Sequence, residues 1–311
     1  MNEAASSSFA WSPGVGPDRT ALDRMAQAFP KPTKPMGEAW FMAPEREMYP
    51  QLFGDITKLQ DDAVTKPLEE IASGLSSFGL LAEWVEWYHY LLPQLIVRRW
   101  KTTFYQPAET LFTAFMIQHP FVGGTPPYPD FYVDALHTLG RYVMSPIFWP
   151  AGKLDAVNCL SKWTGPNGVA GWSWAGSLLS ASLFFSARYL PASDVESWFQ
   201  SAVSISDRLW QLQIMTWLNG AYPILTGEID QPSDFPEFGP LGGGWDWSHA
   251  INGGSAGVPF LPPENCKAIV EVARDLKVEA LIEEIWTDPT MSGIAAEAAG
   301  IPAYFLELYR T

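Results

Sequence analysis

The pentapeptide Pro191-Ala192-Ser193-Asp194-Val195 has three upstream counterparts of the same form, a proline followed by three residues and an aliphatic side chain. The counterparts are Pro67-Leu68-Glu69-Glu70-Ile71, Pro107-Ala108-Glu109-Thr110-Leu111 and Pro150-Ala151-Gly152-Lys153-Leu154. Proline is favoured in the first turn of a helix, because its missing N–H needs no partner there and its φ is already helical. We therefore expect a helix to begin at each of the four prolines, which are 40, 43 and 41 residues apart.

A second helix is expected between successive prolines. Turn-forming residues interrupt the chain at Gly123-Gly124 with Pro126-Pro127, and again at Pro166-Asn167-Gly168. Apolar side chains recur at helical spacing after such breaks, as at Trp174, Leu178, Ala181 and Phe185. No segment alternates apolar and polar residues for long enough to predict a sheet. The sequence therefore predicts an all-α fold built from helical hairpins.

A period near 41 residues made of two helices resembles that of the HEAT and armadillo repeats. The resemblance extends from about Lys66 to Leu225, roughly half of the chain. It implies hairpins stacked into a curved solenoid, because no single hairpin can bury its own apolar face. An irregular helical bundle would contain the same helices, so both architectures are open at this point.

The composition divides the chain into four parts. Residues 1–17 are rich in Ser, Ala, Gly and Pro and are predicted to form a disordered N-terminus. The helical-repeat domain is expected over 18–225, a Gly/Pro/Trp-rich loop over 226–262, and C-terminal helices that pack as a cap on the same domain over 263–311. Within the repeat domain, a central helix is expected to carry Ser173, Ser177 and Ser180 on one face and Trp174, Leu178 and Phe185 on the other.

Charge is the strongest compositional signal. The 311 residues include 34 acidic and 19 basic ones, for a formal charge of −15. Two blocks hold the excess: Gly37–Glu86 has ten acidic and three basic residues, and Thr226–Asp288 has twelve and three. A surface of this kind repels phosphate, which argues against general nucleic-acid binding. The acidity either keeps the protein soluble or attracts a basic protein partner.

The sequence also indicates a compartment. No stretch near Met1 has the form of a secretory signal or a transit peptide, so we expect a cytoplasmic protein. Two cysteines 107 positions apart, Cys159 and Cys266, suit a reducing environment. The uncharged stretch Trp163–Ala187 contains a proline, four glycines and five serines, so membrane insertion is not expected.

One alternative to a binding protein is an enzyme with a di-metal site. Glu86 and His89 are one helical turn apart, as are Asp134 and His137, and Glu109 lies between the two pairs. This order is similar to the carboxylate and histidine pattern of ferritin-like di-iron proteins, which implies iron or manganese. The helix around Glu109 is too short for such a bundle, so our main interpretation includes no metal and no other cofactor.

Two further enzyme alternatives depend on loop residues. The stretch Gly171-Trp172-Ser173-Trp174-Ala175 is similar to the Gly-x-Ser-x-Gly elbow of α/β-hydrolases, and Asp246 and His249 follow it in the required order. The Gly/Trp-rich loop also places Trp245 and Trp247 beside Asp246, a combination suited to stacking and hydrogen bonding with a sugar. The elbow lacks a predicted sheet, and the carbohydrate site lacks an assignable second carboxylate.

The main interpretation is a non-enzymatic binding protein without catalytic residues. Curved helical repeats present extended concave surfaces, and the acidic blocks favour a basic protein partner that the chain binds and neutralises. In acidity, tryptophan content, helical character and size, the chain resembles bacterial toxin-immunity proteins. The residues expected at the partner surface are acidic or aromatic members of the second block: Asp230, Asp234, Glu237, Trp245, Asp246 and Trp247.

Overall fold

The computed structural model describes residues 8–37, 47–78, 81–100, 107–120, 124–155, 161–164, 170–173, 177–235, 245, 248–251, 258–287 and 295–310. Helices dominate this part of the chain, which confirms the all-α prediction. The α-helices are α1 (Arg19–Ala28), α2 (Asp61–Phe78), α3 (Ala82–Ile96), α4 (Pro107–Gln118), α5 (Phe131–His137), α7 (Ser177–Tyr189), α8 (Ala192–Val203), α9 (Arg208–Leu225), α10 (Pro263–Arg274), α11 (Glu279–Thr287) and α12 (Ala295–Tyr309).

Shorter elements connect the helices. The 3₁₀ helices are η1 (Pro50–Phe53), η2 (Ile56–Lys58), η3 (Leu139–Met144), η4 (Pro150–Gly152), η5 (Pro232–Asp234) and η6 (Ser248–Ala250). Two antiparallel hairpins were not expected from the sequence: β1 (Met36–Gly37) pairs with β2 (Glu47–Met48), and β3 (Ser161–Thr164) pairs with β4 (Ala170–Ser173). Strands of two and four residues are too short to produce a recognisable alternation.

Two of the four prolines begin helices as predicted, and two do not. Pro107 is the first residue of α4, and Pro191 directly precedes α8. Pro150 begins only the 3₁₀ helix η4, because Ala151 and Gly152 have φ values of 53° and 75° that end helical geometry at once. Pro67 lies inside α2, which begins six residues earlier at Asp61.

A side chain from outside the helix explains why α2 tolerates Pro67. A proline inside a helix leaves the carbonyl four residues earlier without its N–H donor. In α2 this carbonyl belongs to Ala63, and it accepts a hydrogen bond of 3.3 Å from Gln51 Nε2. Asp61 and Asp62 in the first turn also complement the positive end of the helix dipole. Tertiary contacts therefore move the start of α2 away from its proline.

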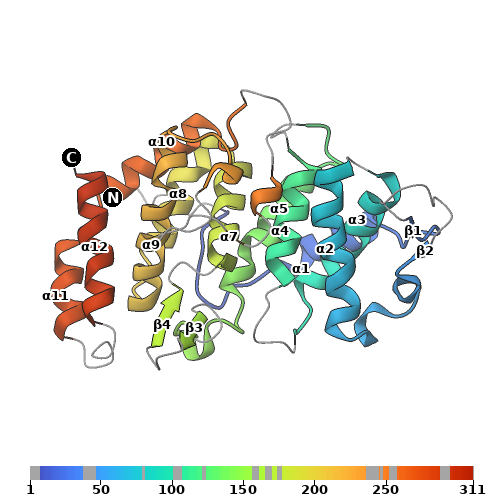
Figure 1. Cartoon of the computed structure of the whole chain (residues 1–311), viewed down its shortest axis with the longest axis horizontal. Coiled ribbons are helices and arrows are strands. Elements are labelled where there is room, and N and C mark those ends of the chain that lie inside the picture. The colour runs from blue at the N-terminus through green and yellow to red at the C-terminus, as the bar shows by residue number, and fades with distance from the viewer. Residues whose placement is uncertain are drawn as a thin grey trace.

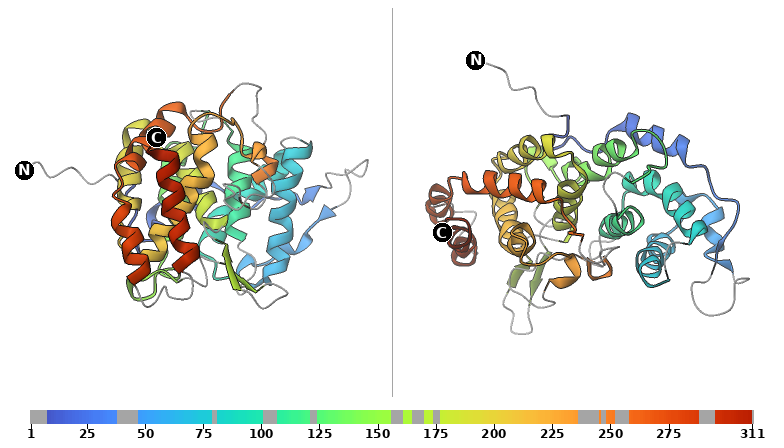
Figure 2. Two further views of the ribbon diagram at one scale, coloured as in Figure 1. Left: turned by 60° about the vertical axis from the view of Figure 1, so that its left-hand side comes forward. Right: turned by 90° about the horizontal axis from the view of Figure 1, so that it is seen from above.

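The helices stand side by side along the long axis of the molecule, from α2 and α3 at one end to α11 and α12 at the other (Figure 1). Viewed from above, several helices are seen end-on while α1 and α10 lie across them (Figure 2, right). Helix α4 packs against α2 and α7, and α9 packs against α10 and α12. A regular repeat of two-helix units stays a prediction.

Helix α7 occupies the middle of this array, in contact with α4, α5, η3 and α10. Leu178 and Phe185 are both buried, as expected of a central helix. The predicted start of this helix was wrong, however. Ser173 is the last residue of strand β4, and α7 begins at Ser177, so Ser173 cannot share a helical face with Ser177 and Ser180.

An N-terminal strap, residues 8–18, packs along the array, which corrects the prediction that all of 1–17 is disordered. The Trp11 side chain is buried, with its ring against Trp198 and Trp210 at centroid distances of 5.4 and 6.0 Å. The Trp11 N–H donates a 2.8 Å hydrogen bond to Ser201 Oγ. At the other end of the strap, the Asp18 side chain caps α1. Residues 1–7 lie outside the described residues.

The C-terminal helices α11 and α12 pack at the α9 end of the array (Figure 1). Asn219 of α9 donates a 3.0 Å hydrogen bond to the carbonyl of Ile301, and Tyr309 OH donates to the carbonyl of Leu218 at 2.8 Å. Among the described residues, no helix is long and apolar enough to span a membrane.

Candidate binding groove

A groove of about 440 Å³ lies where α9 ends and α10 begins. Its walls are the last turn of α9 with the turn that follows, the segment 259–261, and one face of α10. The apolar side chains that line it are Ile224, Leu225, Ile229, Leu261, Cys266 and Val270. The charged residues that line it are Asp230, Lys267, Glu271 and Arg274. We call this cavity the α9–α10 groove.

The first wall is shaped by a tight reversal after α9. The carbonyl of Pro223 accepts hydrogen bonds from the N–H groups of Glu228 and Ile229, at 2.8 and 3.2 Å. Gly227 has a φ of 78°, a left-handed conformation that glycine adopts without steric cost. The reversal turns the chain back along the groove and leaves Glu228 exposed.

The second wall is tied to the first through the backbone. The N–H of Phe260 donates a 2.9 Å hydrogen bond to the carbonyl of Asp230, and Gln231 Nε2 donates to the carbonyl of Val258 at 2.8 Å. The exposed carboxylate of Asp230 is thereby held on a segment with a fixed backbone position.

A buried arginine supports the same wall from inside the molecule. Arg188 of α7 is 6% exposed, and its guanidinium donates to the carbonyls of Phe260 and Pro120. The guanidinium also lies 4.3 Å from the centroid of the Phe260 ring, within the range of a cation–π contact. Arg188 therefore links the central helix to the groove.

The charged residues on the rim of the groove are two carboxylates, Asp230 and Glu271, and two cations, Lys267 and Arg274. Two further carboxylates, Glu228 and Asp234, are exposed within four residues of Asp230 in the sequence. Lys267 is exposed and lies 3.9 Å from Glu271, a spacing that contributes little when both groups are in water. The Asp234 carboxylate accepts a 3.2 Å hydrogen bond from the N–H of Gln231 but is itself exposed. An apolar floor with exposed carboxylates at its rim and in the adjoining turn suits a segment that carries both aliphatic and basic side chains.

The structure separates the predicted partner-binding residues. Asp230 and Asp234 are exposed at or beside the groove, as a partner surface requires. Trp245 is 5% exposed, so its assignment to the surface was wrong. Its ring packs against Phe184 at 5.3 Å, and its Nε1 donates a 3.0 Å hydrogen bond to Thr113 Oγ1. The other three predicted residues, Glu237, Asp246 and Trp247, lie outside the described residues.

Cys266 lies in the floor of the groove and is 7% exposed. Burial raises the pKa of its thiol to about 11, which outweighs the lowering by a backbone hydrogen bond. The thiol is therefore protonated at neutral pH and contributes apolar surface to the groove rather than a nucleophile.

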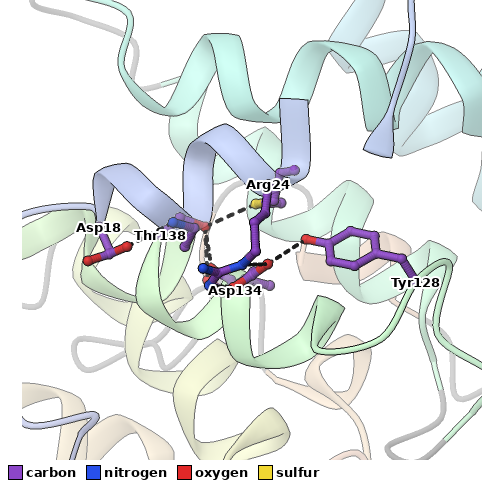
Figure 3. A network of polar contacts seen from close by, with 8 residues as sticks. Asp18, Arg24, Tyr128, Asp134 and Thr138 are labelled. Carbon is purple, nitrogen blue, oxygen red and sulfur yellow. Dashed lines mark hydrogen bonds and ion pairs between the residues drawn. The ribbon is translucent and has the colours of Figure 1, made fainter. Parts of the chain in front are cut away.

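The residues of the alternative metal site make contacts in different parts of the structure. Asp134 of α5 is fully buried and accepts hydrogen bonds from Arg24 Nε at 3.1 Å and from Tyr128 OH at 2.9 Å (Figure 3). His137 packs against Phe9 with ring centroids 4.9 Å apart. Among the described residues, no three histidine, cysteine or carboxylate side chains lie close enough to hold one metal ion. Glu109 is buried in α4, and Glu86 is exposed beside a separate cavity.

His89 has a partner that the sequence did not suggest, His119. Their Nε2 atoms are 3.1 Å apart and their ring centroids 5.3 Å apart, so one imidazole donates a hydrogen bond to the other. Phe29 stacks on His89 at 4.5 Å, and Phe131 packs against both rings. Burial lowers the pKa of His89 to about 4 and that of His119 to about 3. The pair is neutral at pH 7.

This pair predicts a loss of stability in acid. Each folded-state pKa lies below the unfolded value near 6.5, so the neutral pair stabilises the fold above pH 6.5. The contribution is lost as the pH falls toward 4 and then 3, and at pH 5 each histidine is expected to cost roughly 2 kcal/mol. Urea unfolding at pH 7.5 and pH 5 measures this difference. The double variant His89→Phe/His119→Phe should lose less stability between the two pH values, and an unchanged loss would contradict the assignment.

The residues of the hydrolase alternative are also only partly described. Ser173 ends strand β4 of a two-stranded hairpin, and no larger sheet surrounds it in the described part of the chain. His249 is exposed within η6, and Asp246 is outside the described residues. A nucleophile elbow requires a strand inside a sheet followed by a helix, which this hairpin does not supply.

No protein-family model, curated protein or solved structure matches the chain. The groove is therefore interpreted from its own chemistry.

Proposed function

We propose that the protein binds a basic protein partner through the α9–α10 groove and neutralises it by covering the bound segment. An aliphatic side chain of the partner enters the apolar floor, and its lysines or arginines lie against the carboxylates of the rim. The observation that carries this proposal is the exposed carboxylate of Asp230 on the rim of an apolar groove, with the exposed carboxylates of Glu228 and Asp234 close to it in the sequence. Burial of the apolar side chain supplies affinity, while the charges speed encounter and select the partner.

The bound segment is expected to be short. A cavity of about 440 Å³ accommodates only a few side chains, so the remaining specificity comes from the exposed carboxylates on the reversal after α9. Toxin-immunity proteins fit this description, because they act by covering a functional surface and need no chemistry of their own. A basic secreted toxin is the partner class that we propose.

Neutralising the rim tests the role of charge. In the triple variant Glu228→Gln/Asp230→Asn/Asp234→Asn, association with a peptide of lysines flanking a central leucine should slow several-fold and lose most of its salt dependence, since rim charges act in the encounter. Stopped-flow fluorescence with a labelled peptide measures this rate. The thermal midpoint should change little, because exposed charges contribute little to folding.

A matched control removes three exposed carboxylates elsewhere, in Asp23→Asn/Asp62→Asn/Glu307→Gln. This variant has the same net charge as the rim variant and should bind the peptide much as the original protein does. Equal slowing in both variants would mean that only the total charge matters.

A peptide with alanine in place of the central leucine should bind more weakly, and equal binding of the two peptides would reject the apolar floor as the docking site.

A further inference from the structure

A second cavity, of about 520 Å³, lies between η2 and the end of α3. Its lining combines aliphatic side chains with cations, in a protein whose overall charge is −15. The aliphatic residues are Ile56, Leu59, Leu95 and Val97, the cations are Lys58, Arg98 and Arg99, and Thr57 and Gln94 complete the lining. Cavities of several hundred Å³ with an apolar body and few polar groups are typical of small-molecule sites. We call this cavity the η2–α3 cavity.

The two walls of the cavity are locked together by Arg98. Its guanidinium donates hydrogen bonds to the carbonyls of Ile56 and Leu59, at 2.9 and 2.5 Å, and to Asp61 Oδ1 at 2.9 Å. The side chains of Arg98 and Asp61 are only 12% and 11% exposed. Because these groups are hydrogen bonded to one another, Arg98 holds the two walls of the cavity in place. Its positive charge is largely neutralised within the protein.

The charged groups at the mouth of the cavity differ in whether they have an ionic partner. The Asp55 carboxylate accepts hydrogen bonds from the N–H and the hydroxyl of Thr57, and it lies 3.2 Å from Lys58 Nζ. The hydrogen bonds from Thr57 and then the one from Lys58 lower the pKa of Asp55, so this carboxylate stays ionised and partnered. Arg99 is exposed and has no ion pair among the described residues.

The apolar part of the cavity runs from the core to the surface. Leu95 and Ile56 are 0% and 2% exposed and form its inner end. Val97 is 50% exposed, a large value for an aliphatic side chain next to a cavity. An occupant that covers Val97 would remove this surface from water, which is favourable.

We propose that the η2–α3 cavity binds an aliphatic carboxylate, with its chain along Ile56, Leu95 and Val97 and its carboxylate at Arg99. Lys58 lies on the same mouth, but its ammonium is paired with Asp55, so Arg99 is the cation that the ligand carboxylate contacts. The helix dipole alone accounts for cations near the end of α3, but it does not account for an open apolar cavity beside them. An inorganic anion would leave the aliphatic wall uncovered, and a cationic amphiphile would face Arg99.

Isothermal titration calorimetry of the full chain with octanoate tests this site. Octanoate should bind, while octylammonium and octanol, with the same chain, should bind at least about tenfold more weakly, since a hydrogen bond to a charged group is lost. Hexanoate, octanoate and decanoate should bind in increasing order, with roughly fourfold tighter binding for each methylene that the cavity buries. Equal binding of octylammonium and octanoate, or no binding of octanoate, would overturn the proposal.

Two variants locate the binding. Arg99→Gln should weaken octanoate binding about tenfold, and Val97→Asp should abolish it by placing a carboxylate at the mouth. Both residues are exposed, so both variants should fold, which circular dichroism checks. The control Arg19→Gln removes an exposed arginine of α1, with a side chain 84% exposed, and should leave octanoate binding unchanged. Unchanged binding in Arg99→Gln would place the ligand elsewhere and reject the site.

The carboxylate could be free in solution or part of a membrane that contains fatty acid. Sedimentation with phosphatidylcholine vesicles that contain oleic acid distinguishes these sources. If the protein co-sediments with the vesicles and Arg99→Gln abolishes this co-sedimentation, the ligand is a fatty acid in the membrane. If octanoate binds but the protein does not co-sediment, the ligand is a carboxylate in solution. Either result supports an aliphatic carboxylate site.

Discussion

Replacement of Phe185 by alanine is expected to lower the free energy of unfolding by about 3–5 kcal/mol, the usual cost of truncating a buried phenylalanine. Phe185 is fully buried in the central helix α7. Its ring contacts Phe112, Phe115 and Tyr189, with centroid distances of 5.3, 5.1 and 5.0 Å. These rings come from α4 and α7, so the cavity left by alanine cannot close without moving one helix relative to the other. Chemical denaturation followed by circular dichroism measures the change.

Val133→Ala serves as the control for this variant. Val133 lies on α5 and is 38% exposed, so its truncation is expected to change stability by less than about 0.5 kcal/mol. If Phe185→Ala were as mild as Val133→Ala, α7 would not be the central helix of the array.

Replacement of Arg188 by methionine is expected to cost about 3 kcal/mol or more, although methionine is apolar and similar in length. The change leaves the carbonyls of Phe260, which is buried, and of Pro120, which is partly buried, without the donors that Arg188 supplies, and an unsatisfied buried group costs about 1–3 kcal/mol. It also removes the cation from above the Phe260 ring. Thermal and urea unfolding measure the loss of stability.

The same variant has a second readout, because Phe260 is hydrogen bonded to the backbone of Asp230. Arg188→Met should therefore weaken binding of the leucine–lysine peptide, even though Arg188 does not line the groove. Arg19→Met is the control, since Arg19 is exposed on α1, does not line the groove and should affect neither stability nor peptide binding. A stable Arg188→Met protein with normal peptide binding would show that the segment 258–261 is held in place by other contacts.

The sequence predicted the helical class and the central position of α7, because buried helices carry a strong local pattern. It did not predict helix starts uniformly. Pro107 and Pro191 mark starts, whereas the start of α2 depends on a hydrogen bond from Gln51 to Ala63, a contact that proline spacing cannot reveal. Short hairpins such as β3–β4 depend on pairing between strands rather than on periodicity.

Part of the predicted partner surface is exposed in the structure, and its role in binding stays a prediction. Asp230 and Asp234 were identified from the density of acidic residues in the sequence. Charged side chains stay at the surface when a chain folds, and both of these are exposed. Trp245 was placed with them because it follows three glycines and precedes Asp246 in the sequence, but its ring lies in the core, where its indole N–H donates to the buried Thr113 hydroxyl of α4. His119 was missed because its partner lies thirty residues away on another helix, and nothing near it in sequence marks the pairing.

The strap has a consequence for the timing of synthesis. Trp11 is made before its partner Ser201, which follows 190 residues later. At roughly 5–20 residues per second, a ribosome needs roughly 10–40 s to make that stretch. During this interval the Trp11 indole has no docking site, because Trp198 and Trp210 do not yet exist. The strap is thus made well before the surface on which it docks, and its docking requires α8 and the first turn of α9.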